Sequence, residues 1–232
     1  ATKDDVLRWE QSADETVGRA ADALERALES RGLPREVRDA ASQALTLLPR
    51  IRTRVAEIGE GIATDSGGNT RTHGDLHLGQ ILRSASGEFL VIDFEGEPAR
   101  PLAERGARSS PLRDVAGMLR SFAYAAAVGS GLGAVKKRKA QSAKPKAQSA
   151  EPKAQNAEPR AAAWHSACRQ AFLRGYFAEP NGRPGLLPRS RANADRLIAL
   201  FEYEKLCYEL VYELSHRPDW VWVPLRDLTT AA

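Results

Sequence analysis

A repeat near the middle of the chain is the feature that most restricts its fold. The segments Lys139–Pro145, Lys146–Pro152 and Lys153–Pro159 share one seven-residue pattern of lysine, small polar residues and alanine that ends in proline. A coiled coil of this period needs two larger apolar residues in each unit, and a proline interrupts a helix. Alanine is the only apolar residue here, so the sequence predicts a disordered, solvated insertion over 136–160.

The insertion also accounts for the basic charge of the chain. The net charge is +4, but residues 136–160 alone carry eight basic and two acidic side chains, which leaves the rest at −2. The charge therefore gives no reason to expect a specific nucleic-acid partner. The remaining sequence predicts two folded parts, 1–135 and 161–232, on either side of the basic repeat.

Cysteine usage and hydropathy limit the compartment in which we expect the chain. Two cysteines, Cys168 and Cys207, provide no disulfide framework. The most apolar stretch, Phe122–Val135, spans 14 residues and contains three glycines. A membrane helix needs roughly 18 or more apolar residues. The polar start at Ala1–Asp5 has no signal-peptide core. The sequence thus predicts a cytoplasmic chain with no membrane partner.

Helical periodicity dominates outside the repeat. Apolar residues three or four positions apart predict helices over about 17–28, 37–58, 111–127, 161–177 and 192–214, with the second broken or kinked near Pro49. Ser110 and Pro111 suit the start of the third helix. Two short apolar runs, 80–83 and 89–93, flank Ser-Ala-Ser-Gly and predict a β-hairpin. The aromatic tail at 218–225 is expected to be extended.

Chemically active side chains cluster between Thr72 and Glu95. The segment Thr72–Gln80 reads Thr-His-Gly-Asp-Leu-His-Leu-Gly-Gln, and Val-Ile-Asp-Phe-Glu follows after the hairpin turn. Phosphoryl transfer needs a carboxylate to accept the proton of the attacking hydroxyl, together with oxygen ligands for Mg²⁺. Asp75 suits the first role, and Gln80 with Asp93 suits the second. A hairpin between Gln80 and Asp93 would bring both to one edge of the site.

Three neighbouring residues have simpler alternatives. His73 is expected to orient the loop rather than act as a base, because Asp75 already supplies a carboxylate. The role of His77 stays open. Glu95 either assists a second metal ion or bonds the following loop, and the sequence does not decide between these.

These motifs resemble those of a known family. The pattern His-Gly-Asp-Leu-His-x-Gly-Asn, followed by Ile-Asp-Phe/Trp-Glu, is that of the aminoglycoside-phosphotransferase and choline-kinase branch of the protein-kinase-like fold. The chain resembles bacterial maltokinases more closely, through Gln80 in place of asparagine and through the segments Ile92–Pro98, Arg100–Arg105, Ser110–Phe122, Tyr208–Leu214 and Arg217–Trp220. The resemblance implies an α+β fold, mainly α, in which the short β-hairpin carries the metal ligands.

The same resemblance implies function. It implies phosphorylation of maltose to maltose 1-phosphate with ATP and Mg²⁺ as cofactors, and fusion to or association with trehalose synthase. Asp114 resembles the family aspartate that accepts backbone N–H bonds from the catalytic loop.

The last long helix is the best candidate for acceptor binding. At 100° per residue, Tyr203, Cys207, Leu210 and Leu214 share one apolar face. The opposite face mixes aromatic and charged groups that suit a sugar: Phe201, Glu204, Lys205, Tyr208 and Tyr212. We expect Glu204, Lys205, Tyr208 and Tyr212 to bind substrate. The alternative is that they pack against the first two helices and pair with each other.

A kinase of this type also needs an N-terminal lobe with a strand-borne lysine. Only 72 residues precede His73, and they predict helices. The chain is therefore expected to be the C-terminal lobe of a kinase, without the nucleotide lobe. Two other hypotheses remain at this point, a lobe for another acceptor such as an aminoglycoside or amino alcohol, and a non-catalytic binding module. Lys205 would repel the ammonium groups of an aminoglycoside, which favours maltose.

Overall fold

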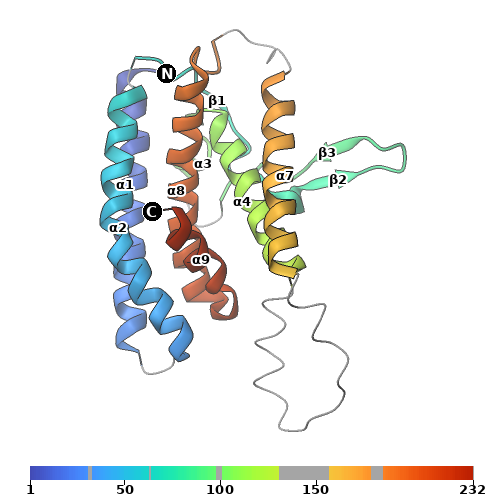
Figure 1. Ribbon diagram of the computed structural model, residues 1–232. Coiled ribbons are helices and arrows are strands. Elements are labelled where there is room, and N and C mark those ends of the chain that lie inside the picture. The colour runs from blue at the N-terminus through green and yellow to red at the C-terminus, as the bar shows by residue number, and fades with distance from the viewer. Residues whose placement is uncertain (31–32, 63, 98–100, 131–156, 179–184, 232) are drawn as a thin grey trace. The chain divides into compact units, whose positions relative to one another are not determined.

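The structure is a computed structural model that describes residues 1–30, 33–62, 64–97, 101–130, 157–178 and 185–231 (Figure 1). These residues are mostly helical, as the sequence predicts, and they contain two small antiparallel sheets, of which the sequence predicts one. They divide into two compact units, one formed by residues 1–120 and 181–232 and the other by residues 121–180. Most of the predicted insertion, 136–156, lies outside the described residues.

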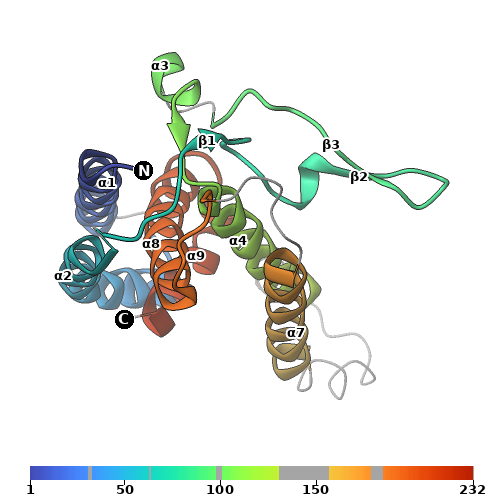
Figure 2. The same ribbon diagram turned by 90° about the horizontal axis from the view of Figure 1, so that it is seen from above.

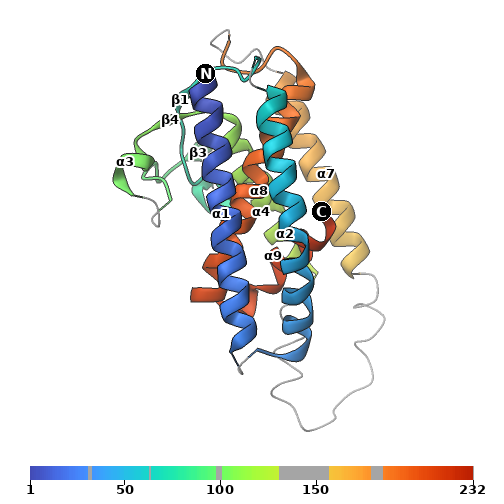
Figure 3. The same cartoon turned by 90° about the vertical axis from the view of Figure 1, so that its left-hand side faces the viewer.

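Helices α1 (Lys3–Glu29) and α2 (Arg35–Ile62) pack side by side in the first unit (Figure 3). A capping box starts α1, because the Thr2 hydroxyl accepts from the backbone N–H of Asp5 and the Asp5 carboxylate accepts from the N–H of Thr2. The backbone bond from Thr2 lowers the pKa of Asp5. The facing stripes, which include Val17, Leu24 and Ile51, are buried.

Helix α2 continues through Pro49 without a break, so of the two predicted outcomes a kink is the one that remains, and Figure 1 shows the first part of α2 inclined to its second part. Proline removes one backbone hydrogen bond and crowds the preceding turn. The neighbouring residues Leu48 and Ile51 are each 2% exposed, so the packing of this turn against the core offsets the lost bond.

Helix α8 (Arg191–His216) lies against both α1 and α2. Ser190 is its N-cap, because the Ser190 hydroxyl accepts from the backbone N–H of Asn193. The Asp65 carboxylate accepts from the backbone N–H groups of Arg189 and Ser190 at 2.8 and 2.9 Å and fixes the residues before the helix. Trp9 of α1 meets the ring of Phe201 edge-on, at 5.6 Å between centroids.

The buried face of α8 differs from the prediction. Phe201 and Glu204 were placed on the acceptor face but are 2% and 1% exposed, whereas Tyr203 and Leu214 of the predicted core face are only half-buried. The prediction assumed a helix covered on one side. Because α8 contacts α1 and α2 as well as α9, buried residues occur on more than one face and the simple amphipathic pattern fails.

The prediction of an extended tail is wrong. Residues Pro218–Trp220 form a 3₁₀ turn, η2, and Trp222–Ala231 form helix α9. Pro218 starts η2 and Pro224 lies in the first turn of α9, where a missing N–H costs little. Val221, Val223 and Leu225 are almost fully buried. Burial of these side chains, through packing of α9 against α2 and α8, stabilises the helix.

The segment between α2 and helix α4 (Leu112–Gly129) carries the predicted hairpin. Strands β1 (Thr70–Arg71) and β4 (Arg108–Ser109) pair with each other. After the 3₁₀ turn η1 (Leu78–Gln80), strands β2 (Ile81–Arg83) and β3 (Phe89–Val91) pair in antiparallel register, with Leu82 opposite Leu90. The short helix α3 (Leu102–Arg105) precedes β4. The predicted hairpin is confirmed, and Ser110 accepts from the N–H of Leu112 at the start of α4.

The hairpin points away from α1, α2 and α8 (Figures 1 and 2). Large apolar side chains are concentrated on its surface. Seven large apolar side chains from this segment are exposed: Leu78, Leu82, Phe89, Leu90, Val91, Ile92 and Phe94. An isolated two-stranded hairpin has little stability of its own, and contiguous exposed apolar surface marks an interaction site.

The second unit contains the end of α4 and helix α7 (Ala157–Ala178). The ring of Phe122 meets Trp164 and Phe172 edge-on, at 6.4 and 5.7 Å. Helix α7 begins four residues earlier than predicted, so the last repeat ends inside it. Pro159 lies in its first turn, where proline is tolerated. None of the described helices is long and apolar enough to cross a bilayer.

Candidate active site

The loop at 73–75 is fixed by Asp114 in the first turn of α4. The Asp114 carboxylate accepts from the backbone N–H of His73 at 2.7 Å and of Gly74 at 2.9 Å. Burial raises the pKa of Asp114 despite these two bonds. Gly74 has φ of +83°, a conformation that glycine adopts without strain. Asp114 thus lies where the predicted scaffold role requires it.

His73 joins the two halves of the predicted site. Its side chain is buried, and its Nε2 lies 2.7 Å from the backbone oxygen of Ile92, which can only accept. Nε2 therefore carries the hydrogen, and Nδ1 is left to accept from the backbone N–H of Asp75 at 3.3 Å. The imidazole thereby links the Asp75 loop to the residue before Asp93.

Gln80 and Asp93 lie together at the base of the hairpin. The side-chain amide of Gln80 donates from Nε2 to Oδ2 of Asp93 at 2.7 Å. The backbone N–H of Ile92 donates to the backbone oxygen of Gln80 at 3.0 Å. Asp93 has φ of +66°, which turns the chain sharply after β3. The amide oxygen and the carboxylate are hard donors of the kind that Mg²⁺ takes. Among the described residues, no three His, Cys, Asp or Glu side chains gather around a possible metal position.

Asp75 meets the last long helix. Its Oδ1 accepts from Nζ of Lys205 at 2.9 Å, and the same ammonium pairs with Glu97. Burial lowers the pKa of Lys205, but the nearby carboxylates of Glu97 and Asp75 outweigh it and raise the pKa overall. The Lys205 ammonium also lies 5.0 Å from the ring centre of Tyr208.

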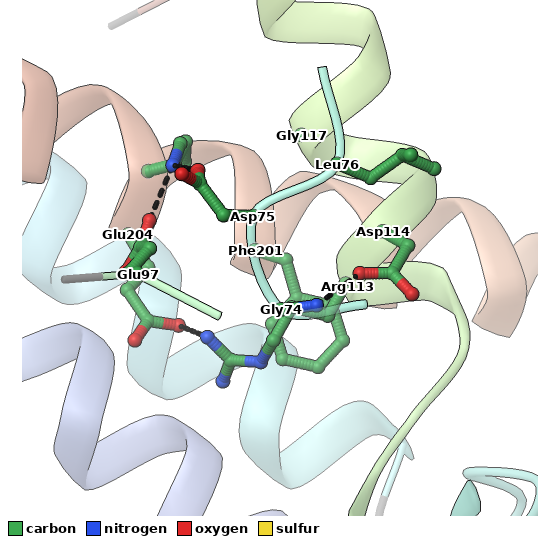
Figure 4. Close-up of a pocket in the computed structure, with 10 residues that line it drawn as sticks. Gly74, Asp75, Leu76, Glu97, Arg113, Asp114, Gly117, Phe201 and Glu204 are labelled. Atoms are coloured by element: carbon green, nitrogen blue, oxygen red, sulfur yellow. Dashed lines mark hydrogen bonds and ion pairs between the residues drawn. The ribbon is translucent and has the colours of Figure 1, made fainter. Parts of the chain in front are cut away.

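A pocket opens beside Asp75 (Figure 4). Its polar lining consists of four carboxylates and two cations: Asp75, Glu97, Asp114, Glu204, Arg113 and Lys205. Arg113 pairs with Glu204 at 2.9 Å and covers the Phe201 ring at 4.5 Å. A Cβ at Gly117 would lie 2.7 Å from the backbone oxygen of Leu76, so only glycine lets α4 approach the loop this closely.

The other three residues predicted to bind substrate, Glu204, Tyr208 and Tyr212, differ in their exposure and in their partners. Glu204 is almost fully buried, and its carboxylate accepts from the Ser12 hydroxyl at 2.8 Å as well as pairing with Arg113. Tyr208 is half-buried, and burial raises its pKa. Tyr212 is 37% exposed and stacks between Tyr208 and His216, with centroids at 6.3 and 4.6 Å.

His77 and Glu95 lie apart from the pocket lining. His77 caps η1, because its Nδ1 accepts from the N–H of Gly79 at 3.0 Å. Glu95 is exposed.

Sequence reasoning missed Glu97 and Arg113. The run Asp93, Glu95, Glu97 places carboxylates at every second position, and nothing in that pattern separates the buried Glu97 from the exposed Glu95. Arg113 adjoins Asp114, but its partner Glu204 is distant in sequence. Only the folded chain pairs these groups.

Comparisons with known proteins find similarity to glucosamine kinases. No protein-family model matches the chain. A glucosamine kinase of Streptacidiphilus jiangxiensis is 32% identical over 160 residues, 68% of this chain and 30% of that protein. A glucosamine kinase of Mycolicibacterium smegmatis is 30% identical over 154 residues, 66% of this chain and 32% of that protein.

Solved structures extend the likeness to nearly the whole chain. A glucosamine kinase in complex with glucosamine, ADP and inorganic phosphate matches with a TM-score of 0.68 and 27% identity, over 99% of this chain and 48% of that one. A second crystal form of a glucosamine kinase gives the same TM-score over 46% of its length. The chain has the fold of part of a sugar kinase. It spans less than half the length of these relatives.

Proposed function

We propose that this chain is the acceptor-binding and base-carrying part of a sugar kinase that transfers the γ-phosphoryl group of ATP to a sugar hydroxyl. The observation that carries the proposal is the placement of Asp75, on a loop fixed by Asp114 and beside a pocket, with Oδ1 held by Lys205. The similarity to glucosamine kinases supports a sugar as the acceptor.

In the proposed reaction, Asp75 accepts the proton of the attacking hydroxyl. The new bond forms between the sugar oxygen and the γ-phosphorus, the bond from that phosphorus to the bridging oxygen breaks, and ADP leaves. The pocket holds the sugar so that this hydroxyl lies within hydrogen-bond reach of Asp75. The Asp75 carboxylate later returns its proton to solvent.

Gln80 and Asp93 are the residues that would hold Mg²⁺. When bound, the ion supplies charge neutralisation for the phosphate oxygens. One amide oxygen and one carboxylate suffice when phosphate and water complete the shell. The Gln80 amide already lies against Asp93, so a rotation of its side chain by half a turn would direct its oxygen toward a shared ion.

Glucosamine is the acceptor that we propose first, with maltose as the competing candidate. The expectation that Lys205 repels an ammonium sugar depended on a free positive charge. In the structure Lys205 is paired with Asp75 and Glu97, and carboxylates outnumber cations four to two around the pocket. This balance suits an amino sugar. The relatives give no support for an association with trehalose synthase.

The nucleotide-binding part of the enzyme is proposed to lie outside this chain. The described residues contain no strand with a lysine for the phosphates, and the relatives are more than twice as long as the matched region. We propose that this part packs against the exposed apolar side chains of the hairpin at 78–94. This chain alone is accordingly expected to bind ATP only weakly.

Tyr208 tests the acceptor site. We expect Tyr208→Ala to raise the sugar KM of the full-length protein by roughly one to two orders of magnitude, because the half-buried ring beside Lys205 offers a stacking surface for a sugar. The ATP KM should change much less. Tyr208→Phe keeps the ring and serves as the matched control, with a KM close to that of the parent. Equal increases in both KM values for Tyr208→Ala would show that the residue is structural.

A further inference from the structure

The ammonium of Lys205 is held between two carboxylates of different exposure. Both line the pocket, but Glu97 is 4% exposed and Asp75 is 23% exposed, so Glu97 is the buried partner of the ammonium and Asp75 the more accessible one. The two carboxylates come from different ends of the segment that carries the hairpin, and the lysine comes from α8. Lys205 is therefore the direct link between the acceptor helix and the catalytic loop.

The position of Lys205 along α8 is fixed by its neighbour. Glu204 is bound to Ser12 of α1 and to Arg113 of α4, and this sets the rotation of the helix at that turn. The backbone position from which the Lys205 side chain extends to Asp75 is therefore fixed. The four-carbon side chain is flexible, but the ion pair with Glu97 fixes the position of its ammonium group.

A general base such as Asp75 must be held in a fixed orientation toward the hydroxyl whose proton it accepts. A displacement of about 1 Å in a reacting group can lower a rate on the order of 100-fold. Asp75 lies in a loop whose backbone is tied to Asp114, but its carboxylate still needs a partner to hold it. Lys205 binds Oδ1, so Oδ2 is the oxygen available to the acceptor hydroxyl.

We infer that Glu97 is a positioning residue for the proposed kinase reaction. Glu97 anchors Lys205, and Lys205 holds Oδ1 of Asp75 so that Oδ2 takes the proton of the acceptor hydroxyl. Glu97 does not touch the reacting atoms. The inference rests on the proposed function, and it assigns Lys205 to the orientation of the base in addition to its predicted contact with the sugar.

Steady-state kinetics of the full-length protein test the role in catalysis. We expect Glu97→Gln to lower kcat on the order of 10- to 100-fold while the sugar KM stays within about threefold, because the lost anchor acts on the base and not on sugar binding. Glu97→Asp keeps the charge and should recover part of kcat. Glu15→Gln is the matched control, since Glu15 is an exposed residue of α1 that accepts from the Gln11 amide, away from the pocket lining. An unchanged kcat, or a rise in KM alone, would overturn the inference.

A chemical readout on this chain separates the inference from the proposed function. Acetic anhydride acylates accessible amines, and mass spectrometry of peptides measures the rate at each lysine. Lys205 should react at least about tenfold more slowly than the exposed Lys3, and Glu97→Gln should raise the Lys205 rate severalfold while Glu15→Gln leaves it unchanged. Equal rates for Lys205 in the parent and Glu97→Gln would overturn the anchoring role, whether or not the full-length protein phosphorylates a sugar.

Discussion

Replacement of Asp75 by asparagine is expected to lower kcat of the full-length protein by about 10²- to 10⁴-fold, the range that loss of a general base produces. Asparagine has nearly the shape of aspartate but cannot accept the proton of the attacking hydroxyl. The ATP KM should stay within about twofold, because the change acts on the transition state. Initial rates measured first at varied ATP and then at varied sugar concentration give kcat and the two KM values separately.

Asp195→Asn is the control for the Asp75 substitution. Asp195 lies in the first turns of α8 and pairs with Arg191 on the surface, where both side chains are 52% exposed. Removal of this carboxylate should leave kcat unchanged. A fully active Asp75→Asn protein would exclude Asp75 as the base.

Substitution of Arg120 by methionine is expected to have the largest effect on stability. Arg120 is 7% exposed and binds Glu209 through Nε and the terminal nitrogen at 3.0 and 2.7 Å, and Asp227 at 2.8 Å. Methionine fills the space but leaves the buried Glu209 carboxylate without its cation, while Asp227 keeps its pair with Arg226 at 2.9 Å. Removal of one partner from a buried ion pair costs about 3–5 kcal/mol. Burial raises the pKa of Glu209, so loss of Arg120 favours its protonated form further.

Urea denaturation of this chain measures the Arg120 effect. Arg54→Met is the matched control, because Arg54 pairs with Glu57 on the surface at 2.9 Å and an exposed pair contributes little to stability. The free energy of unfolding should fall by several kcal/mol for Arg120→Met, whereas the control should unfold at the same urea concentration as the parent. A loss below about 1 kcal/mol at Arg120 would show that the network linking α4, α8 and α9 does not hold the first unit together.

The long helices and the hairpin could be predicted from sequence because their signals are local. Heptad-like spacing in α1 and α2, and the two apolar runs around Ser84–Gly87, need no knowledge of the rest of the chain. The failures occur where neighbours decide the outcome. The aromatic tail contains two prolines and reads as extended. It becomes α9 because Val221, Val223 and Leu225 are buried and α9 packs against α8 and against α2, which lies far away in the sequence.

Some residues of the candidate site could be predicted from local motifs, and others could not. Asp75, Gln80 and Asp93 lie in short motifs, and the hairpin that joins Gln80 to Asp93 is itself a local feature. Glu97 and Arg113 could not be found, since their partners Lys205 and Glu204 lie on α8, about 90 to 110 residues later. The face of α8 that meets the loop also escaped prediction, because a helix with neighbours on several sides loses its amphipathic pattern.

The most direct test of the proposed function is phosphoryl transfer itself. The full-length protein is incubated with ATP and Mg²⁺ and with glucosamine, maltose or glucose, and ³¹P nuclear magnetic resonance follows the products. We predict a sugar phosphate and an equal amount of ADP, with glucosamine turned over more efficiently than maltose, and loss of the signal when EDTA removes the metal. ADP release without a sugar phosphate, or no turnover with any of these sugars, would contradict the proposal that this chain carries the catalytic base of a sugar kinase.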